Sequence, residues 1–320
     1  MIKYSFIVPA YNEEKALPLF YERAVPVFER LDGDFEVIFI NDGSNDKTEE
    51  VISRLSEKDA RIKGVSFSRN FGQQSALLCG LSHASGDAVV AMDADLQDPP
   101  EVALTLIEKW KEGYDIVHAR HKKRAGENVF KRFTAFLYYR TLNRWTNLNI
   151  PLDCGDFKLF DRKAVDAVTH MDEHTRLLRA QTAWIGFRQT VVEFDRPSRV
   201  AGETKYTLQK MIDLAKSGIV PDSRKILNFS LKAGIGALIL SLAGFITLIV
   251  LTALGIEHGG LTAWIFPSLA LVVGILSVNT GLQNLYLSEI YKECRNRPHY
   301  IVRTRYNLTE EAEKKDGEKD

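Results

Sequence analysis

Residues 88 to 97 read Ala88-Val89-Val90-Ala91-Met92-Asp93-Ala94-Asp95-Leu96-Gln97, an apolar run followed by two carboxylates and an amide. The apolar run predicts a short buried strand, and the acidic cluster begins where that strand should end. Two carboxylates at positions i and i+2, with an amide close by, offer the hard oxygen ligands that Mg²⁺ or Mn²⁺ prefers. Asp93, Asp95 and Gln97 are therefore candidate metal ligands. A lone Asp-x-Asp also occurs by chance in surface loops, so its interpretation depends on the rest of the chain.

The same change from an apolar run to turn residues occurs three more times in the first hundred residues. Phe6 to Val8 leads into Pro9-Ala10-Tyr11-Asn12-Glu13-Glu14, Val37 to Ile40 into Asn41-Asp42-Gly43-Ser44, and Val65 to Phe67 into Ser68-Arg69-Asn70. Helical periodicity fills the first two intervals, so the order is strand, helix, strand, helix. This alternation predicts an α/β fold with a mostly parallel sheet covered by helices on both faces. Ligands of such sheets bind outside the carboxyl ends of the strands, where the four motifs can converge.

The composition narrows the class of protein. The 320 residues include 42 basic and 42 acidic side chains, and this balance gives no global field that would favour a nucleic-acid partner. The three cysteines, Cys79, Cys154 and Cys294, show no metal-ligand spacing, and no pair of histidines has zinc spacing. We therefore expect a protein of a reducing compartment without a zinc site. The first residues run straight into a strand, so no signal peptide is expected.

Two uncharged stretches predict a membrane hairpin. Ala233 to Ile256 would span about 36 Å as a helix, against a hydrocarbon core of roughly 30 Å. Leu261 to Leu287 is a second such stretch, interrupted by Pro267 and three side-chain amides. The alternative is a buried helical hairpin in a soluble domain. Basic residues flank both outer ends, whereas the connector has neither Lys nor Arg, so the positive-inside rule predicts an integral protein of the cytoplasmic (inner) membrane, with the catalytic domain and both termini cytoplasmic.

These features divide the chain into four parts. We expect a catalytic domain at 1–200, a juxtamembrane amphipathic helix or linker at 201–230, two transmembrane helices at 231–290, and a cytoplasmic tail at 291–320 with a disordered end. The amphipathic helix fits two places equally well, either among membrane lipids in the headgroup plane or packed on the soluble domain. Small residues in the second span, Gly274, Ser277 and Gly281, would allow close helix approach and suggest a homo-oligomer.

Five motifs together resemble a known family. They are Val8-Pro9-Ala10-Tyr11-Asn12-Glu13-Glu14, Asn41-Asp42-Gly43-Ser44, Ser68-Arg69-Asn70-Phe71-Gly72, Asp93-Ala94-Asp95-Leu96-Gln97-Asp98-Pro99-Pro100-Glu101 and Gly155-Asp156-Phe157. The chain is similar, from its first strand through both membrane helices, to family 2 glycosyltransferases that act on polyprenyl phosphate. The likeness is greatest to the bactoprenol glucosyltransferases of O-antigen modification, with dolichol-phosphate mannose synthases as cousins.

The resemblance implies a GT-A nucleotide-sugar-binding fold and a role for each motif. Pro9, Tyr11, Glu13 and Asp42 would bind the base and ribose, with Asp93 also at the nucleotide. Asp93, Asp95 and Gln97 would bind or orient the metal at the diphosphate. From the residues alone, Asp42 could equally cap a helix, and Tyr11 could be a partly buried aromatic side chain.

The expected chemistry needs little acid–base catalysis. A divalent cation would stabilise the charge that develops on the leaving nucleotide, with Asp95 as one catalytic carboxylate. The acceptor would be a lipid phosphate, which is already mostly dianionic at neutral pH. Asp156 matches the position that the family assigns as base, but it could instead position the acceptor. Arg120, in a basic stretch, and Lys158 are the candidate acceptor-phosphate ligands, although Lys158 cannot make the bidentate contact of the Arg found in many relatives.

The leading hypothesis is an inverting, metal-dependent glycosyltransferase that moves a hexose onto undecaprenyl phosphate, with glucose from UDP-glucose as the favoured donor. A dolichol- or polyprenyl-phosphate mannosyl- or aminosugar transferase using another nucleotide sugar remains open, because no residue selects the donor. Two alternatives come from other classes: a non-catalytic lipid flippase component or membrane scaffold, and a sugar nucleotidyltransferase. The intact carboxylate cluster argues against the first, and the membrane spans argue against the second.

Overall fold

The computed structural model describes residues 2–122, 154–171, 177–195 and 297–308, together with isolated positions between 253 and 294. The chain divides into two units, one comprising Met1–Tyr139, Leu148–Thr207 and Arg297–Asp320 and the other Arg140–Asn147 and Leu208–Asn296. The expected amphipathic helix lies outside the described residues, as do the expected spans, apart from those isolated positions. None of the helices in the described ranges is long and apolar enough to cross a membrane.

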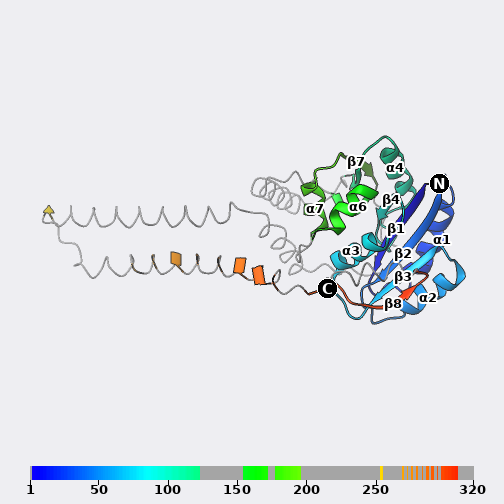
Figure 1. Ribbon diagram of the computed structural model, residues 1–320, viewed down its shortest axis with the longest axis horizontal. Coiled ribbons are helices and arrows are strands. Elements are labelled where there is room, and N and C mark those ends of the chain that lie inside the picture. The colour runs from blue at the N-terminus through cyan, green and yellow to red at the C-terminus, as the bar shows by residue number, and fades with distance from the viewer. Residues whose placement is uncertain are drawn as a thin grey trace. The chain divides into compact units, whose positions relative to one another are not determined.

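The first unit is built from strands and helices that alternate over most of its length (Figure 1). Its described strands are β1 (Lys3–Ala10), β2 (Asp34–Asn41), β3 (Ile62–Phe67), β4 (Ala88–Ala91), β5 (Ile116–His121), β6 (Cys154–Asp161), β7 (Gln189–Phe194) and β8 (Val302–Tyr306). Its described helices are α1 (Ala16–Phe28), α2 (Thr48–Lys58), α3 (Gln73–His83), α4 (Pro100–Lys111), α6 (Arg162–Thr169) and α7 (Leu178–Trp184). The four expected strands are β1 to β4, each ending within two residues of the end of its apolar run.

The strands form one sheet in the order β7-β5-β6-β4-β1-β2-β3-β8. Strands β3, β2, β1 and β4 are parallel neighbours, whereas β6 runs antiparallel to both β4 and β5. The carboxyl ends of β1 to β5 therefore meet at one edge of the sheet, together with the beginning of β6. This arrangement confirms the α/β fold with a mostly parallel sheet.

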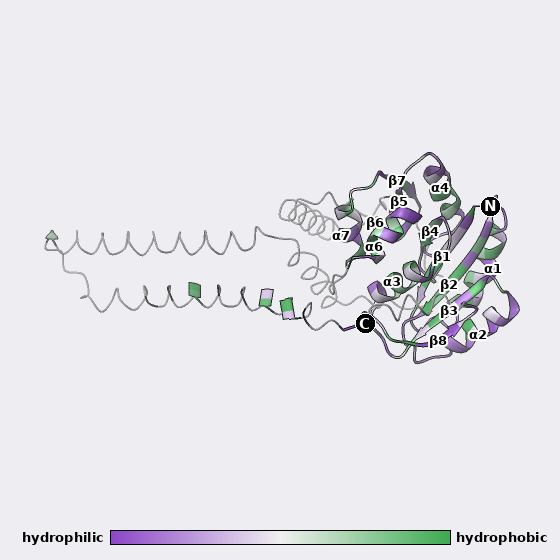
Figure 2. Ribbon diagram, viewed as in Figure 1, coloured by the Kyte–Doolittle hydropathy of each residue, from purple (hydrophilic) through white to green (hydrophobic). Residues whose placement is uncertain are grey.

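Side chains that alternate along each strand make two apolar layers, one on each face of the sheet. Phe6 and Val8 of β1 pack in a cluster with α1, α2 and α4, whereas Ile7 between them packs with α3, α6 and α7. The apolar residues lie along the strands and the inner helix faces in Figure 2. Burial on both faces explains why these strands read as continuous apolar runs rather than as alternating patterns.

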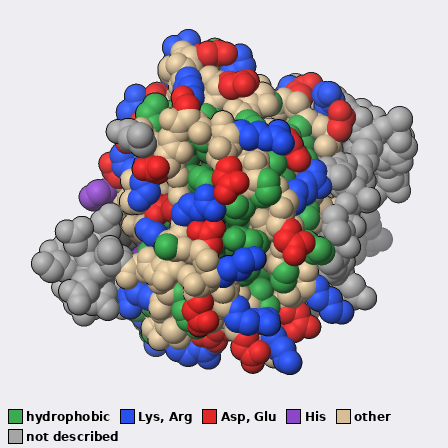
Figure 3. Space-filling model, turned by 90° about the vertical axis from the view of Figure 1, so that its right-hand side faces the viewer, with side chains coloured by type: hydrophobic (Ala, Val, Ile, Leu, Met, Phe, Trp, Pro, Cys, Tyr) green, Lys and Arg blue, Asp and Glu red, His purple; other side chains and the backbone are tan. Residues whose placement is uncertain are grey.

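The outer surface carries both signs of charge. On the face shown in Figure 3, basic and acidic side chains lie interspersed rather than grouped by sign. Exposed pairs such as Arg23 with Glu101 and Lys109 with Glu112 are examples. Such pairs contribute about 0–1 kcal/mol each, so the buried interactions of the sheet matter more for stability.

Strand β8 brings the end of the chain back to the sheet of the first unit. It pairs antiparallel with β3, and the ring of Tyr300, just before it, stacks on Phe67 at 4.9 Å between centroids. The Asn307 amide donates hydrogen bonds to the backbone carbonyls of Ser56 and Ile62 at 2.6 and 2.9 Å. Residues 291–320 were expected to form a tail, and no strand was predicted there. The structure adds an ordered edge strand within that range.

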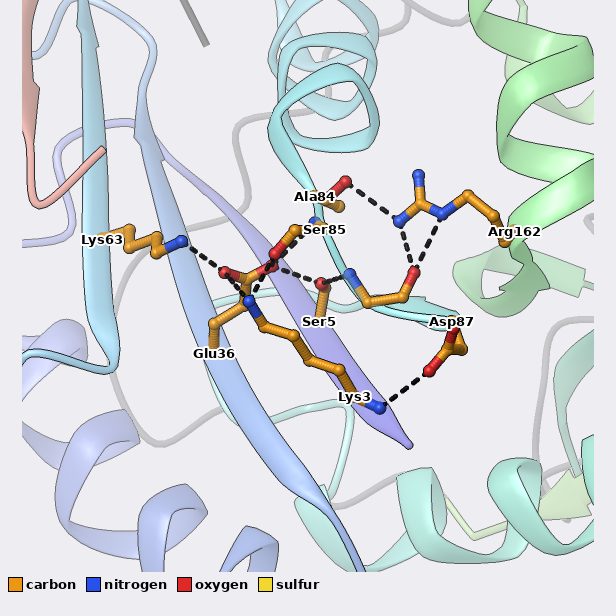
Figure 4. A network of polar contacts seen from close by, with 9 residues as sticks. Lys3, Ser5, Glu36, Lys63, Ala84, Ser85, Asp87 and Arg162 are labelled. Atoms are coloured by element: carbon orange, nitrogen blue, oxygen red, sulfur yellow. Dashed lines mark hydrogen bonds and ion pairs between the residues drawn. The ribbon is translucent and has the colours of Figure 1, made fainter. Parts of the chain in front are cut away.

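A polar network closes the opposite edge, where the parallel strands begin (Figure 4). The buried Glu36 carboxylate accepts hydrogen bonds from the Ser5 hydroxyl at 2.6 Å and from the Ser85 backbone N–H at 2.8 Å, and it pairs with Lys63 Nζ at 2.6 Å. The Arg162 guanidinium continues the network by donating to the backbone carbonyls of residues 84 and 86. This cluster joins β1, β2, β3 and the start of β4, so we assign it to stability.

Replacing Glu36 by Gln should lower the stability of the first unit by about 3 kcal/mol at pH 7. Burial opposes ionisation, but Lys63 and the Ser5 and Ser85 hydrogen bonds outweigh it and hold the pKa of Glu36 at about 2, against 4.5 ordinarily. The stabilisation is therefore complete above pH 4.5 and is lost as the pH falls toward 2. Thermal unfolding between pH 7 and pH 3 measures this, and the variant should show the smaller decline. Asp32→Asn, which breaks an exposed pair with Lys111, is the matched control. Equal declines in Glu36→Gln and wild type would contradict the assignment.

Candidate active site

Hydrogen bonds join the loops after β1 and β2 at the edge of the sheet where the parallel strands end, which we call the rim. The Asp42 backbone N–H donates to the carbonyl of Ala10 at 2.9 Å, and the Glu13 N–H donates to Thr48 Oγ1 at 2.8 Å. The Asn12 side chain accepts from the Asn45 N–H at 2.8 Å, with the Asn12 backbone in the left-handed region at φ 55°. Pro9, Tyr11, Glu13 and Asp42, the residues expected at the nucleotide, therefore belong to one side of the rim. Their nucleotide contacts remain a prediction.

The Asp42 carboxylate has a clear structural task. It is 4% exposed and accepts hydrogen bonds from the backbone N–H groups of Phe71, at 2.7 Å, and Gly72, at 3.0 Å. Burial raises the pKa of Asp42, and these hydrogen bonds oppose the rise. Helix α2 is preceded by a different carboxylate, Asp46, which accepts from the Thr48 N–H. Asp42 therefore does not cap α2, the helix that follows it in sequence. Instead it fixes the loop that precedes α3.

The acidic loop after β4 is held in shape by its own carboxylates. Asp95 Oδ1 accepts from the Gln97 N–H at 3.0 Å, and Asp98 Oδ2 accepts from the Asp93 N–H at 3.0 Å. Leu96 between them is buried and has φ 60°, a left-handed conformation that non-glycine residues rarely adopt. This strain shows that the loop is fixed by its surroundings, as in many ligand sites.

The donor set of this loop fits a divalent cation that also binds a diphosphate. In the described part of the chain, no three His, Cys, Asp or Glu side chains gather as a metal cage. Mg²⁺ sites at phosphates usually take only one or two carboxylates, because the substrate phosphates and water supply the other ligands. Asp93 and Asp95 meet that requirement, and Gln97 is the third expected ligand.

Asp156 and Asp93 come to the same place from different strands. The register pairs Lys158 of β6 with Ala91 of β4, so the start of β6 lies beside the residues that follow β4. Two consecutive side chains at the start of α3 contact both carboxylates: Gln73 Nε2 donates to Asp93 Oδ1 at 3.2 Å, and Gln74 Nε2 donates to Asp156 Oδ2 at 3.3 Å. The candidate metal site and the candidate catalytic carboxylate are therefore neighbours.

The surroundings of Asp156 keep it ionised. Burial by itself raises the pKa of Asp156, but the charges of Arg179 and Lys158, with hydrogen bonds from Arg179 and Gln74, outweigh burial and hold it below the ordinary value. Arg179 Nε lies 3.1 Å from Asp156 Oδ1. A carboxylate with a lowered pKa is a weak base at neutral pH, so its environment favours a positioning role over proton removal.

Lys158 is a buried cation next to this carboxylate. Its side chain is 1% exposed, and burial lowers its pKa to about 8, with Asp156 opposing the shift. Across the strand pair, His118 is held by Gln189 Oε1 at 2.9 Å, and burial and Lys158 lower the pKa of His118 to about 4. His118 is therefore neutral at pH 7.

Arg120 lies at the carboxyl end of β5, opposite Cys154 in register, and so at the edge where the other motifs meet. Its guanidinium pairs with Glu193 of β7 at 2.5 Å, and both side chains are substantially exposed. Such a pair contributes little, so a phosphate can compete for the guanidinium. The assignment of Arg120 to the acceptor phosphate remains a prediction.

Four residues at this rim were not assigned to the site by the sequence analysis. They are Gln73, Gln74, Asp98 and Arg179, each with a hydrogen bond to one of the assigned residues. Asp98 is part of the motif that runs from Asp93 to Glu101. The two glutamines directly follow another such motif, and this adjacency was the available signal. Arg179 contacts Asp156 across 23 residues, and no local pattern indicates that contact.

Comparison with known proteins gives a consistent family. A model described as glycosyl transferase family 2 matches residues 5–169. The chain is 42% identical over 310 residues to the glycosyltransferase YkcC of Bacillus subtilis, covering 96% of this chain and 95% of that protein. It is 38% identical over 309 residues to a prophage bactoprenol glucosyl transferase homolog of Escherichia coli, covering 94% and 99%. It is 37% identical over 307 residues to the bactoprenol glucosyl transferase of Shigella phage SfII, covering 94% and 98%.

One similar solved structure is glucosyl-3-phosphoglycerate synthase from Mycobacterium tuberculosis in complex with Mn²⁺, UDP-glucose and phosphoglyceric acid. The TM-score is 0.46 at 21% identity, covering 68% of this chain and 78% of that one. The family match spans the strands and loops that build the rim, and the relatives extend over nearly the whole chain. The chain thus belongs to glycosyl transferase family 2 and is a glycosyltransferase with a GT-A-like α/β fold.

Proposed function

We propose that this glycosyltransferase moves a hexose from a nucleotide sugar onto a polyprenyl phosphate, with UDP-glucose as the favoured donor and undecaprenyl phosphate as the acceptor. One observation carries the proposal: Gln73 and Gln74, neighbours in sequence, hold Asp93 and Asp156, so a candidate diphosphate site and a buried cation, Lys158, share one rim. Near-full-length relatives named bactoprenol glucosyl transferase support the choice of donor and acceptor.

Asp93, Asp95 and Gln97 would hold Mg²⁺ or Mn²⁺ at the donor diphosphate. A bound divalent cation would act there as a Lewis acid and stabilise the negative charge on the leaving nucleoside diphosphate. The residues of the chain prepare this site: the Asp98 carboxylate fixes the Asp93 backbone, and Gln73 orients the Asp93 side chain. Such supporting contacts typically change metal affinity about 10- to 100-fold.

The transfer itself needs no proton to be removed by the protein. An oxygen of the lipid phosphate attacks the anomeric carbon, the bond from that carbon to the diphosphate oxygen breaks, and the configuration inverts. The phosphate monoester is mostly dianionic at neutral pH, since its second pKa lies near about 6. Lys158 and Arg120 would bind the incoming phosphate. Asp156, which is ionised, would then act by positioning Lys158 rather than as a base.

The two uncharged stretches support a location at the cytoplasmic membrane. They lie in the chain between β7 and β8, and both of these strands belong to the one sheet. A segment whose two ends attach to one cytoplasmic domain must cross a membrane an even number of times, as the expected pair of spans does. Among the isolated described positions there, five large aliphatic side chains are more than half exposed: Leu254, Leu269, Leu276, Leu287 and Ile290. Apolar exposure of this kind suits contact with lipid. Assembly into a homo-oligomer remains a prediction.

The test incubates the purified full chain with undecaprenyl phosphate and a panel of labelled nucleotide sugars, with and without Mg²⁺ or Mn²⁺. Label from UDP-glucose that appears in the organic phase only with metal is the expected result. Label from another donor alone would replace glucose. Release of inorganic diphosphate would indicate a nucleotidyltransferase, and lipid movement without sugar turnover would indicate a flippase component or scaffold. Either of the last two outcomes would overturn the proposal.

Replacing Arg120 by Ala should raise the KM for the lipid phosphate about tenfold, because a single charge-assisted contact is worth about 1.5 kcal/mol. The KM for the nucleotide sugar should stay the same. Initial rates at varied undecaprenyl phosphate measure the change. Arg188→Ala is the matched control, since Arg188 stacks on Tyr114 and its backbone pairs with Asp115 at the opposite end of β5. Unchanged acceptor kinetics in Arg120→Ala would remove Arg120 from the acceptor site.

A further inference from the structure

The side chain of Gln74 joins three elements through the two ends of its amide. Its Nε2 donates to Asp156 Oδ2 at 3.3 Å, and its Oε1 accepts from the Leu178 backbone N–H at 2.9 Å. A backbone N–H can only donate, so the amide oxygen must face Leu178 and the NH₂ must face Asp156. The orientation of the amide is thus fixed by its partners, and it matches an ionised carboxylate, which can only accept.

The same contacts start helix α7. Leu177, the residue before the helix, provides no side-chain cap, and the Leu178 N–H at the first position is satisfied by Gln74 instead. The next residue of α7, Arg179, donates to the other oxygen of Asp156 at 3.1 Å. A closed ring of contacts therefore runs from Gln74 to Asp156, to Arg179, and back through the backbone to Leu178.

This ring leaves the Asp156 carboxylate one orientation. Both of its oxygens are engaged, one from α3 and one from α7, and the carboxylate itself is 10% exposed. The charged groups facing it are Arg179 from α7 and Lys158 from its own strand, and beyond Lys158 lies the neutral His118 of β5. At neutral pH no other side chain of this length has both a donor and an acceptor at its end. Glutamate would place a second carboxylate against Asp156, and methionine would leave the Leu178 N–H without its acceptor.

We propose that Gln74 is a positioning residue of the transfer reaction: it holds Asp156 ionised and in one orientation, so that Asp156 fixes Lys158 and Arg179 for the acceptor phosphate. This inference rests on the proposed function, because it requires that the cations beside Asp156 bind that phosphate. Helix α3 then links the candidate metal site to the candidate acceptor site. Gln73 holds Asp93 at the first, and Gln74 on the same turn holds Asp156 at the second.

The experiment compares the full-length wild type with Gln74→Glu from about pH 5.5 to about pH 9, using the transfer assay with the best donor. The neighbouring Asp156 carboxylate should raise the pKa of the introduced carboxyl group from about 4.3 into this range. At the low end it is then protonated, so it can donate to Asp156 and still accept from the Leu178 N–H, and the variant should be within about threefold of wild type. As that proton is lost, two carboxylates face each other, and the ratio of variant to wild-type kcat/KM should fall at least about tenfold. Taking the ratio at each pH cancels the titration of the lipid phosphate. Returning the sample to low pH should restore activity.

Gln74→Met is the matched control, with a similar length and no hydrogen-bonding group. Its kcat should fall about tenfold at every pH, with the KM for the nucleotide sugar unchanged. If Gln74→Glu does not fold, the Met variant still decides: wild-type kcat in that variant would overturn the inference. A Gln74→Glu profile parallel to wild type would also overturn it while leaving the proposed function intact. A wild-type chain that transfers no sugar would overturn the proposed function, and the inference with it.

Discussion

Asp95→Asn should lower metal-dependent transfer by roughly 10³-fold, equivalent to about 4 kcal/mol of transition-state stabilisation, while the chain remains folded. Asn keeps the shape of Asp and the oxygen that accepts from the Gln97 N–H, so the loop geometry is preserved. What is lost is the negative charge that a divalent cation requires next to the diphosphate. Transfer assays across a Mn²⁺ titration, with thermal unfolding of the same samples, measure both parts of this expectation.

The matched control for Asp95→Asn is Asp34→Asn, an equal change at an exposed position where β2 begins, at the opposite edge of the sheet. That variant should transfer sugar at the wild-type rate. If Asp95→Asn kept full activity with an unchanged metal requirement, the assignment of the acidic loop to a metal would be wrong. If Asp95→Asn unfolded, Mn²⁺ binding by the wild-type protein in the presence of UDP would test the metal site instead. Absence of binding would show that the assignment is wrong.

Lys158→Met should lower kcat/KM for the lipid phosphate by about 10²-fold, because it removes the buried cation proposed to bind the acceptor. In wild type the activity should fall as the pH rises through about 8. Burial lowers the pKa of Lys158 to that value, so the ammonium is charged below about pH 8 and neutral above it. The activity should also fall as the pH drops through about 6, because the phosphate monoester gains its second proton there. Together the two titrations predict a bell-shaped profile of kcat/KM.

Lys158→Arg separates charge from size. Arginine stays protonated at every pH used, so the fall above about pH 8 should disappear even if the larger guanidinium lowers the rate. An alkaline fall that persists unchanged in Lys158→Arg would show that another group titrates there. Circular dichroism of both variants guards against loss of fold, since the side chain is almost completely buried.

The sequence was most informative where a feature depends on neighbours in the chain. Each change from an apolar run to turn residues marked a strand end to within two residues, because strand burial and loop polarity both follow from local composition. Asp156 was assigned only through the family resemblance, and the structure places it beside Asp93 through the contacts of Gln73 and Gln74. The nucleotide, metal and acceptor contacts themselves remain predictions.

The rest depended on contacts across long stretches of chain. Asp42 binds backbone groups about 30 residues away, and Gln74 binds one 104 residues away. No periodicity encodes such pairs. Strand β8 is a different case, since Val302, Thr304 and Tyr306 alternate with two arginines, the pattern of a half-buried strand. Its position after the uncharged stretches led to its assignment as a tail.

The place of β8 at the end of the chain sets an order of assembly during synthesis. Its partner β3 leaves the ribosome about 235 residues earlier, which at roughly 5–20 residues per second is a delay of about 12–47 s. Throughout that interval the outer edge of β3 is an unpaired template that another nascent chain could bind. The sheet is therefore completed only after residues 208–296 have been synthesised. A chain truncated before residue 302 would keep the outer edge of β3 unpaired.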